Sequence, residues 1–286
     1  GQTGRALTIG LTGPPGVGKS TLGNALVRKA RSLGKSVGVI SVDPSSPFSH
    51  GALLGDRIRL SEHFTDAKVF IRSMASRGHL GGLAGATADA VSLMDAFGMD
   101  VVIVETVGVG QSEIEIAELT QTTIVALQPG SGDSIQVLKA GILEIADIFV
   151  VNKKDHPMAN QLKHEIRSMM EMLDFKGWVP ELVMTQATGG DGVEELWAAI
   201  LRHADYLRES GELDERRRES FAHQVRQLAL GQLERKLDRQ LASELAAGVD
   251  PYAAAERVLH AFGVSFEGTD EPVRAPHVRA SVKGLI

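Results

Sequence analysis

Residues 13–20 carry the spacing of glycine, lysine and hydroxyl side chains that proteins use to hold phosphate groups. They read Gly-Pro-Pro-Gly-Val-Gly-Lys-Ser, which matches G-x-x-x-x-G-K-[ST], and they follow an apolar run at 7–12. Glycines let consecutive backbone N–H groups wrap a phosphate, and the helix that follows adds a positive dipole. We expect Lys19 to reach the β- and γ-phosphates of a nucleotide and Ser20 to ligate Mg²⁺, unless this is a chance glycine-rich turn. The other positions expected to line the nucleotide are Gly13, Pro15, Gly16, Val17, Gly18 and Thr21.

A second motif, Asn-Lys-Lys-Asp at 152–155, follows the apolar run at 148–151. Open parallel sheets bind ligands at the carboxyl ends of their strands, so this motif is placed to meet the base of a nucleotide. The Asp155 carboxylate can accept hydrogen bonds from the ring N–H and the exocyclic amine of guanine, which adenine does not present as a pair. With the first motif, Asn152, Lys153 and Asp155 predict binding of GTP and GDP rather than ATP.

A third group, Glu-Thr-Val-Gly at 105–108, ends the apolar run at 100–104. Many GTPases carry an acid three residues before a glycine at this place. Glu105 can hold Mg²⁺ directly or through water, and Gly108 can offer its N–H to the γ-phosphate; a salt-bridged strand end is the alternative for Glu105. Val109 stands where a glutamine would orient the attacking water, which predicts slow intrinsic hydrolysis.

Four other positions could belong to the same site, and each has a structural alternative. Asp43 closes an apolar run and suits a link to Mg²⁺ through water, or it caps the turn that follows. Asp56 follows the same loop and could orient water or respond to the γ-phosphate. Gln186 and Ala187 follow the last expected strand and could meet the base with backbone N–H groups, or they form a plain turn.

Composition narrows the classes of partner. The 286 residues carry a formal net charge of -6, which argues against nucleic acid or an anionic membrane as a partner. The chain has no cysteine, and its nine histidines show no tight ligand spacing, so a transition-metal site is not supported. No apolar run reaches the roughly 18 residues that span a bilayer. We expect a cytoplasmic protein, or a mitochondrial matrix protein if a transit peptide was removed.

The elements that must position these residues alternate in type from residue 6 to about residue 208. Short β-rich runs and longer helix-patterned stretches predict an α/β fold of the P-loop NTPase kind, with a mostly parallel sheet flanked by helices. Proline- and glycine-rich stretches at 44–55 and 78–85 are expected to be loops that sense the nucleotide. The expected strands are 7–12, 36–42, 68–73, 100–105, 122–127, 148–152 and 182–185.

From residue 209 the sequence becomes dense in charge, with apolar residues at steps of three to five. This pattern predicts a long amphipathic helix whose apolar side carries Phe221, Val225, Leu228, Leu233, Leu237, Leu241 and Leu245. Pro251 is well placed to begin a second, short helix, and roughly the last 20 residues are expected to form a loosely ordered tail. We therefore divide the chain into a nucleotide domain at 1–208 and a helical segment with a tail at 209–286.

Several segments together resemble the MeaB/ArgK GTPases, the chaperones of methylmalonyl-CoA mutase. The match spans nearly the whole chain, and the runs Val-Asp-Pro-Ser-Ser and Glu-Thr-Val-Gly-Val-Gly-Gln-Ser are uncommon in other P-loop proteins. The segments that carry the resemblance are 13–21, 42–46, 55–59, 81–84, 105–113 and 152–155.

The resemblance implies a homodimer joined by a C-terminal arm, and GTP hydrolysis that gates the transfer or protection of adenosylcobalamin on the mutase. It implies Mg²⁺ roles for Ser20, Asp43 and Glu105, and it adds Asp56 to a catalytic set with Lys19 and Glu105. Two other activities stay open. One is a kinase of a periplasmic arginine or ornithine transport protein, and the other is a GTPase that inserts nickel or zinc into an enzyme.

Overall fold

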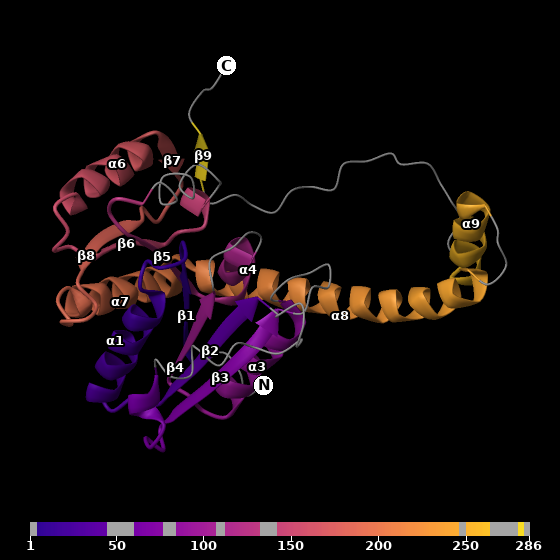
Figure 1. The fold of residues 1–286 in the computed structure, drawn as a ribbon, viewed down its shortest axis with the longest axis horizontal. Coiled ribbons are helices and arrows are strands. Elements are labelled where there is room, and N and C mark those ends of the chain that lie inside the picture. Colours follow the sequence, from indigo (N-terminus) through magenta and orange to yellow (C-terminus); the bar gives the residue numbers. More distant parts are fainter. Residues whose placement is uncertain are drawn as a thin grey trace. The chain divides into compact units, whose positions relative to one another are not determined.

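The computed structural model describes residues 5–44, 60–76, 84–106, 112–131, 142–245, 250–263 and 280–282. Its central sheet has seven parallel strands in the order β3-β2-β4-β1-β5-β6-β8 (Figure 1). The strands are β1 (Leu7–Thr12), β2 (Val37–Pro44), β3 (Val69–Ser76), β4 (Val101–Thr106), β5 (Thr122–Leu127), β6 (Ile148–Asn152) and β8 (Glu181–Thr185). The predicted α/β fold with a mostly parallel sheet is therefore confirmed.

Strand positions follow from buried runs of β-branched and aliphatic residues. β1, β5 and β6 begin and end at the predicted residues, and every residue of β4, β5 and β6 is buried. Such continuous burial is typical of parallel strands that are covered on both faces. β2 and β3 extend two and three residues past their predicted ends because they pair with each other as far as Pro44 and Ser76.

Helices cover both faces of the sheet. α1 (Lys19–Ser32) and α7 (Val193–Ser210) pack on one face, and α3 (Ala84–Ala96), α4 (Ser112–Leu119) and α6 (Ala159–Glu171) pack on the other. Successive side chains of a strand point to opposite faces, so Ile124 joins the core under α1 and α7 while Val125 joins the core under α6. Two short 3-10 helices, η1 (Ser61–His63) and η2 (Ile142–Glu144), lie in the connections.

A second, two-stranded sheet pairs β7 (Leu173–Phe175) antiparallel with β9 (Ala280–Val282). Neither strand was predicted, because three residues carry too little periodicity to separate a strand from a loop. β9 also differs from the expectation of a loosely ordered tail, since three tail residues form a regular strand.

The chain divides into two compact units. One holds the described residues up to Phe221 together with β9, and the other begins at Ala222. α8 (Glu212–Leu245) runs from the first unit into the second, which also contains α9 (Pro251–Ala261). Both helices were predicted. Phe221 on α8 is 67% exposed and Leu228 is 53% exposed, so this helix presents apolar side chains to its surroundings.

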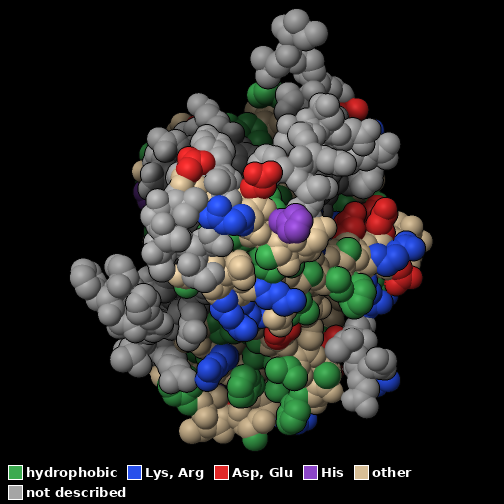
Figure 2. All heavy atoms as spheres, turned by 90° about the vertical axis from the view of Figure 1, so that its right-hand side faces the viewer, with side chains coloured by type: hydrophobic (Ala, Val, Ile, Leu, Met, Phe, Trp, Pro, Cys, Tyr) green, Lys and Arg blue, Asp and Glu red, His purple; other side chains and the backbone are tan. Residues whose placement is uncertain are grey.

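No described helix is long and apolar enough to cross a bilayer. On the face drawn in Figure 2, the described Lys and Arg side chains are interspersed with Asp, Glu and hydrophobic side chains.

Candidate nucleotide-binding site

The phosphate loop, which is the motif at residues 13–20, leaves β1 at the carboxyl edge of the sheet and leads into the first turn of α1. Gly13 has a φ of 138°, and a Cβ atom there would lie 2.0 Å from the carbonyl oxygen of Ala126. Gly18 precedes α1 with a φ of 92°, and a Cβ atom there would lie 2.7 Å from Asn152 Nδ2. Both positions need glycine, because other residues rarely adopt such angles and the neighbouring atoms leave no room for a side chain.

Lys19 is buried, and its ammonium group bends back over the loop. Its Nζ donates to the carbonyl oxygens of Gly13 at 2.6 Å and Pro14 at 2.9 Å. A negatively charged phosphate oxygen is a stronger acceptor than either neutral carbonyl. The loop thus holds the ammonium group at a place where phosphate groups can compete for it.

Ser20 and Glu105 form a buried pair, in which Ser20 Oγ donates to Glu105 Oε1 at 2.6 Å. Glu105 lies on β4 opposite Leu11 of β1, so it stands beside the strand that leads into the phosphate loop. Mg²⁺ prefers such oxygen ligands, so the pair fits this ion. Asp43 lies on β2, two residues beyond Ser41, which is paired with Glu105. This register places Asp43 near the same edge, although its side chain lies outside the described part of the chain.

Asn152 links three segments of the site. Its Nδ2 donates to the carbonyl oxygen of Val17 at 2.8 Å, and its Oδ1 accepts from Thr185 Oγ1 at 3.0 Å and from the Ala187 N–H at 3.2 Å. The side chain is buried, with 3% exposed. Asn152 therefore holds the phosphate loop against the end of β8.

Lys153 makes a second link to the phosphate loop. It has a φ of 59°, and its Nζ donates to the Gly16 carbonyl oxygen at 3.2 Å and to Gln128 Oε1 at 2.5 Å. Gln128 was not predicted as part of the site. It directly follows β5, so the rule that ligands meet the carboxyl ends of strands could have identified it.

Asp155 is exposed and has no hydrogen-bond or ion-pair partner in the described part of the chain. Its neighbour Lys154 forms an ion pair with Asp191. The Asp155 carboxylate is thus available to a base. The Gln186 N–H donates to the Asp191 carbonyl oxygen at 2.9 Å, and the Ala187 N–H is taken by Asn152, so contact of either N–H with a base stays a prediction.

The described residues bring Lys19, Ser20 and Glu105 to the phosphate loop, and the loop contacts Asn152 and Lys153. Asp56 and Gly108, and also Val109, lie outside the described residues, so their predicted roles stay predictions.

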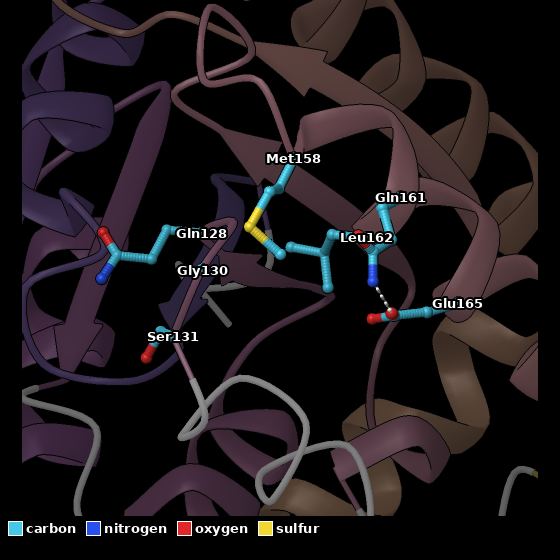
Figure 3. Close-up of a pocket in the computed structure, with 7 residues that line it drawn as sticks. All are labelled: Gln128, Gly130, Ser131, Met158, Gln161, Leu162 and Glu165. Carbon is cyan, nitrogen blue, oxygen red and sulfur yellow. Dashed lines mark hydrogen bonds between the residues drawn. The ribbon is translucent and has the colours of Figure 1, made fainter.

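A cavity of about 220 Å³ lies on the α6 side of Gln128 (Figure 3). Gln161 Nε2 donates to Glu165 Oε1 at 2.9 Å on its α6 wall, while Met158 and Leu162 supply its apolar surface. No residue of the phosphate loop lines it, so this cavity is separate from the place where phosphate groups are expected. Its lining residues are Gln128, Gly130, Ser131, Met158, Gln161, Leu162 and Glu165.

The helix that follows the phosphate loop is braced by η1. His63 Nε2 lies 2.7 Å from Asn24 Oδ1 on α1, and the His63 ring is buried. Burial lowers the pKa of His63, because the cation loses its hydration, while the nearby Glu62 carboxylate opposes this shift. The ring is therefore held neutral at a contact that supports α1.

Comparisons with known proteins agree with this geometry. Residues 1–242 match the family model described as Methylmalonyl Co-A mutase-associated GTPase MeaB. A protein of Pyrococcus horikoshii whose name describes it as a GTPase is 48% identical over 268 residues, which cover 90% of this chain and 84% of that protein. The mouse protein named methylmalonic aciduria type A homolog, mitochondrial, is 36% identical over 221 residues, covering 75% of this chain and 53% of that protein.

Among solved structures, the crystal structure of LAO/AO transport system kinase matches with a TM-score of 0.65 and 26% identity, covering 92% of this chain and 83% of that chain. The family model and the Pyrococcus horikoshii relative are named GTPases, and the phosphate loop, the Ser20–Glu105 pair and Asp155 suit that activity. Hydrolysis of GTP is therefore the reaction of this site. The chain belongs to the family of methylmalonyl-CoA mutase-associated GTPases, MeaB.

Proposed function

We propose that this GTPase is a Mg²⁺-dependent switch that gates adenosylcobalamin loading onto methylmalonyl-CoA mutase and protects that enzyme. The Ser20–Glu105 pair beside the phosphate loop is the observation that carries the switch, because it can report on the metal and the phosphates together. The choice of client is supported by the family description, which names the mutase, and by the name of the mouse relative.

Different groups at the phosphate end of the site bind the phosphate oxygens and the metal ion. Lys19 and the backbone N–H groups of the loop bind the phosphate oxygens, while Ser20 and Glu105 would hold Mg²⁺ and Asp43 would be linked to it through water. When bound there, Mg²⁺ would neutralise the charge that develops on the phosphate oxygens during hydrolysis. We place Asp56 beside the attacking water.

The response to hydrolysis and the choice of base involve other residues. Gly108 donates its N–H to the γ-phosphate, so the loop that follows β4 is released when that phosphate leaves. Asp155 accepts from guanine, supported by Asn152 and Lys153, and Gln186 and Ala187 lie beside the base. With valine at position 109, intrinsic hydrolysis is slow, so the client can set the rate.

We propose that residues 1–208 bind the nucleotide and that residues 209–286 join two copies of the chain into a homodimer. Phe221, Val225 and Leu228 of α8 are each about half exposed or more, and a second copy would bury them. Sedimentation should give a dimer for the wild type and a monomer for Val225→Asp combined with Leu228→Asp. A monomeric wild type would remove this part of the proposal. We propose the cytoplasm as the location, with the mitochondrial matrix as the alternative that the name of the mouse relative mentions.

The decisive experiment for the client is steady-state GTP hydrolysis, alone and with a purified adenosylcobalamin-dependent mutase from the same source. Strong stimulation supports the proposed function, and Glu105→Gln, which removes a metal ligand, should remove the stimulated rate. Unchanged hydrolysis at saturating mutase would leave a GTPase whose client is a different protein.

A kinase activity is the second candidate, and the observation that favours it is the likeness to the solved structure named LAO/AO transport system kinase. Its test is transfer of labelled γ-phosphate from GTP or ATP to a purified periplasmic amino-acid-binding protein. Labelled acceptor protein would support the kinase, whereas release of free phosphate alone would support the switch.

A further inference from the structure

A buried ionic cluster lies at the amino edge of the sheet, opposite the edge that carries the phosphate loop. Asp147 immediately precedes β6 and is only 2% exposed. Its Oδ2 accepts from the Thr123 N–H at 2.7 Å, and His203 Nε2 lies 3.3 Å from its Oδ1. A buried carboxylate needs a compensating charge.

Arg216, on the second turn of α8, supplies that charge. Its Nη2 donates to Asp147 Oδ1 at 3.0 Å and its Nη1 to Asp147 Oδ2 at 3.3 Å, a two-pronged arrangement that fixes the guanidinium plane. Nη1 also donates to the Gln121 carbonyl oxygen at 2.5 Å. Because Gln121 precedes β5 and Asp147 precedes β6, one side chain of α8 ties the starts of two adjacent strands together.

Aromatic side chains enclose this cluster. Trp178 Nε1 donates to the Asp147 carbonyl oxygen at 2.8 Å, and the Trp178 ring lies 4.9 Å from the His203 ring. Tyr206 donates its hydroxyl to Glu212, the first residue of α8, and this bond raises the pKa of Tyr206. The first turns of α8 are therefore attached to the start of β6 by the Arg216–Asp147 ion pair and to α7 by the Tyr206–Glu212 hydrogen bond.

The same two strands end in the nucleotide site. β5 leads directly to Gln128, and β6 ends at Asn152, which is followed by Lys153. Gln128 and Lys153 are bonded to each other, and Asn152 and Lys153 are bonded to the phosphate loop. Between the two ends, β5 and β6 are buried throughout and pair in register from Ile124 with Ile148 to Leu127 with Val151. Close-packed interiors transmit displacement because they compress little.

We propose that Arg216 is a positioning residue of the GTPase: through Asp147 and Gln121 it couples the position of α8 to the base site at the far ends of β5 and β6. This inference rests on the proposed switch function, because it names how the helical segment at 209–286 and the nucleotide influence each other. Linkage makes the coupling reciprocal, so the nucleotide must change the stability of the start of α8 by the same factor.

The neighbouring arginine provides a matched control. Arg217 also lies on α8, where its Nη1 is 3.5 Å from Asp214 Oδ1; 42% of the Arg217 side chain and 79% of the Asp214 side chain are exposed. Arg217→Gln removes the same charge from the same turn of α8 without touching Asp147. Arg216→Gln removes the connection, and Arg216→Lys keeps the charge but loses the two-pronged contact.

The test uses the full chain and two readouts. The first is the Kd for GDP and for a non-hydrolysable GTP analogue. The second is amide hydrogen exchange at residues 212–221 with and without that analogue. In the wild type and in Arg217→Gln, the analogue should slow exchange at these residues several-fold. Arg216→Gln should weaken nucleotide binding about five- to tenfold and abolish the nucleotide-dependent change in exchange. Arg216→Lys should give values between those of the wild type and Arg216→Gln in both readouts.

Two results would overturn the inference. One is wild-type exchange at residues 212–221 that does not respond to the nucleotide, which needs no variant to be seen. The other is a folded Arg216 variant that keeps both the wild-type Kd and the wild-type response. Neither readout involves the mutase. If the wild type hydrolyses GTP but is not stimulated by the mutase, the proposed client is refuted, and the coupling through Arg216 is unaffected.

Discussion

The two edges of the central sheet both carry buried charged groups, but they satisfy them differently. At the carboxyl edge, Lys19 is held by neutral carbonyls and Ser20 by Glu105, partners that a phosphate or a metal ion can replace. At the amino edge, Asp147 is matched by the Arg216 guanidinium and a backbone N–H, with the His203 ring beside it, within one closed cluster. Replaceable partners are typical of a binding site, and mutually matched charges are typical of an anchor. Substitutions at the carboxyl edge should therefore mainly change hydrolysis, whereas those at the amino edge should mainly change stability, with a smaller effect on nucleotide affinity through Arg216.

The largest effect is expected for Lys19→Ala. Removing an ammonium group that faces the transferred phosphate should lower kcat/KM for GTP about 1000-fold, on the order of 4 kcal/mol of transition-state stabilisation. The melting temperature of the nucleotide-free protein should hardly change, because Lys19 donates to carbonyls of its own loop. Hydrolysis kinetics and thermal unfolding on one preparation check both statements. A large loss of stability with retained hydrolysis would reverse the assignment of the two edges.

Asp147→Asn should show the opposite pattern. It removes one partner of a buried ion pair, and such a change costs about 3 kcal/mol of unfolding free energy, measured by denaturant titration. The exposed Asp214→Asn on α8 is the control and should cost at most about 0.5 kcal/mol. If Asp147→Asn and Asp214→Asn are equally stable, the amino-edge cluster does not anchor the fold.

Asp155→Asn should change the preferred base while leaving stability unchanged. An amide cannot accept from both the ring N–H and the amine of guanine, so affinity for GTP should fall about 100-fold, just under 3 kcal/mol. Xanthine has a carbonyl in place of that amine, and the amide can donate to it, so affinity for XTP should rise. Competition binding with GTP, XTP and ATP measures the switch. Asp205→Asn, an exposed position on α7, should keep the wild-type order of affinities.

The smallest effect concerns pH and His63. Burial lowers the pKa of this residue from an unfolded value near 6.5. As the pH falls below about 6.5, the unfolded chain therefore binds more protons than the folded chain. Stability that is present above that pH is therefore lost as the pH falls toward the folded pKa. His63→Gln, which keeps an N–H for Asn24, should lose less melting temperature than the wild type between pH 7.5 and pH 5.5. The exposed His164→Gln should follow the wild type.

Much of the fold could be predicted from local patterns. The buried runs of β1, β5 and β6 gave their boundaries to the residue, because strands covered on both faces admit few polar residues. The ends of β2 and β3 depend on pairing between them, which no single run encodes. β7 and β9 depend on a contact between residues more than 100 positions apart.

The site was predictable where a motif fixes the backbone, as with Gly13, Gly18 and Lys19. Motif spacing did not identify Gln128, because one glutamine after a strand has no spacing partner; only its place directly after β5 could have indicated it. Sequence patterns also gave no sign that Asn152 bonds its amide to Val17, Thr185 and Ala187. The Asp147–Arg216 pair was missed for a similar reason, since its residues lie in separate elements and only the packing of α8 brings them together.

The most direct test of the carboxyl edge as the catalytic site is the Mg²⁺ dependence of steady-state GTP hydrolysis in the wild type and in Glu105→Gln. Glutamine keeps the size of the side chain and can still bond to Ser20, but it lacks the charge that holds a divalent ion. We predict that the wild type requires Mg²⁺ and that Glu105→Gln needs at least about tenfold more Mg²⁺ for half of its maximal rate. The same Mg²⁺ dependence in both proteins would contradict the assignment of Ser20 and Glu105 as the metal site.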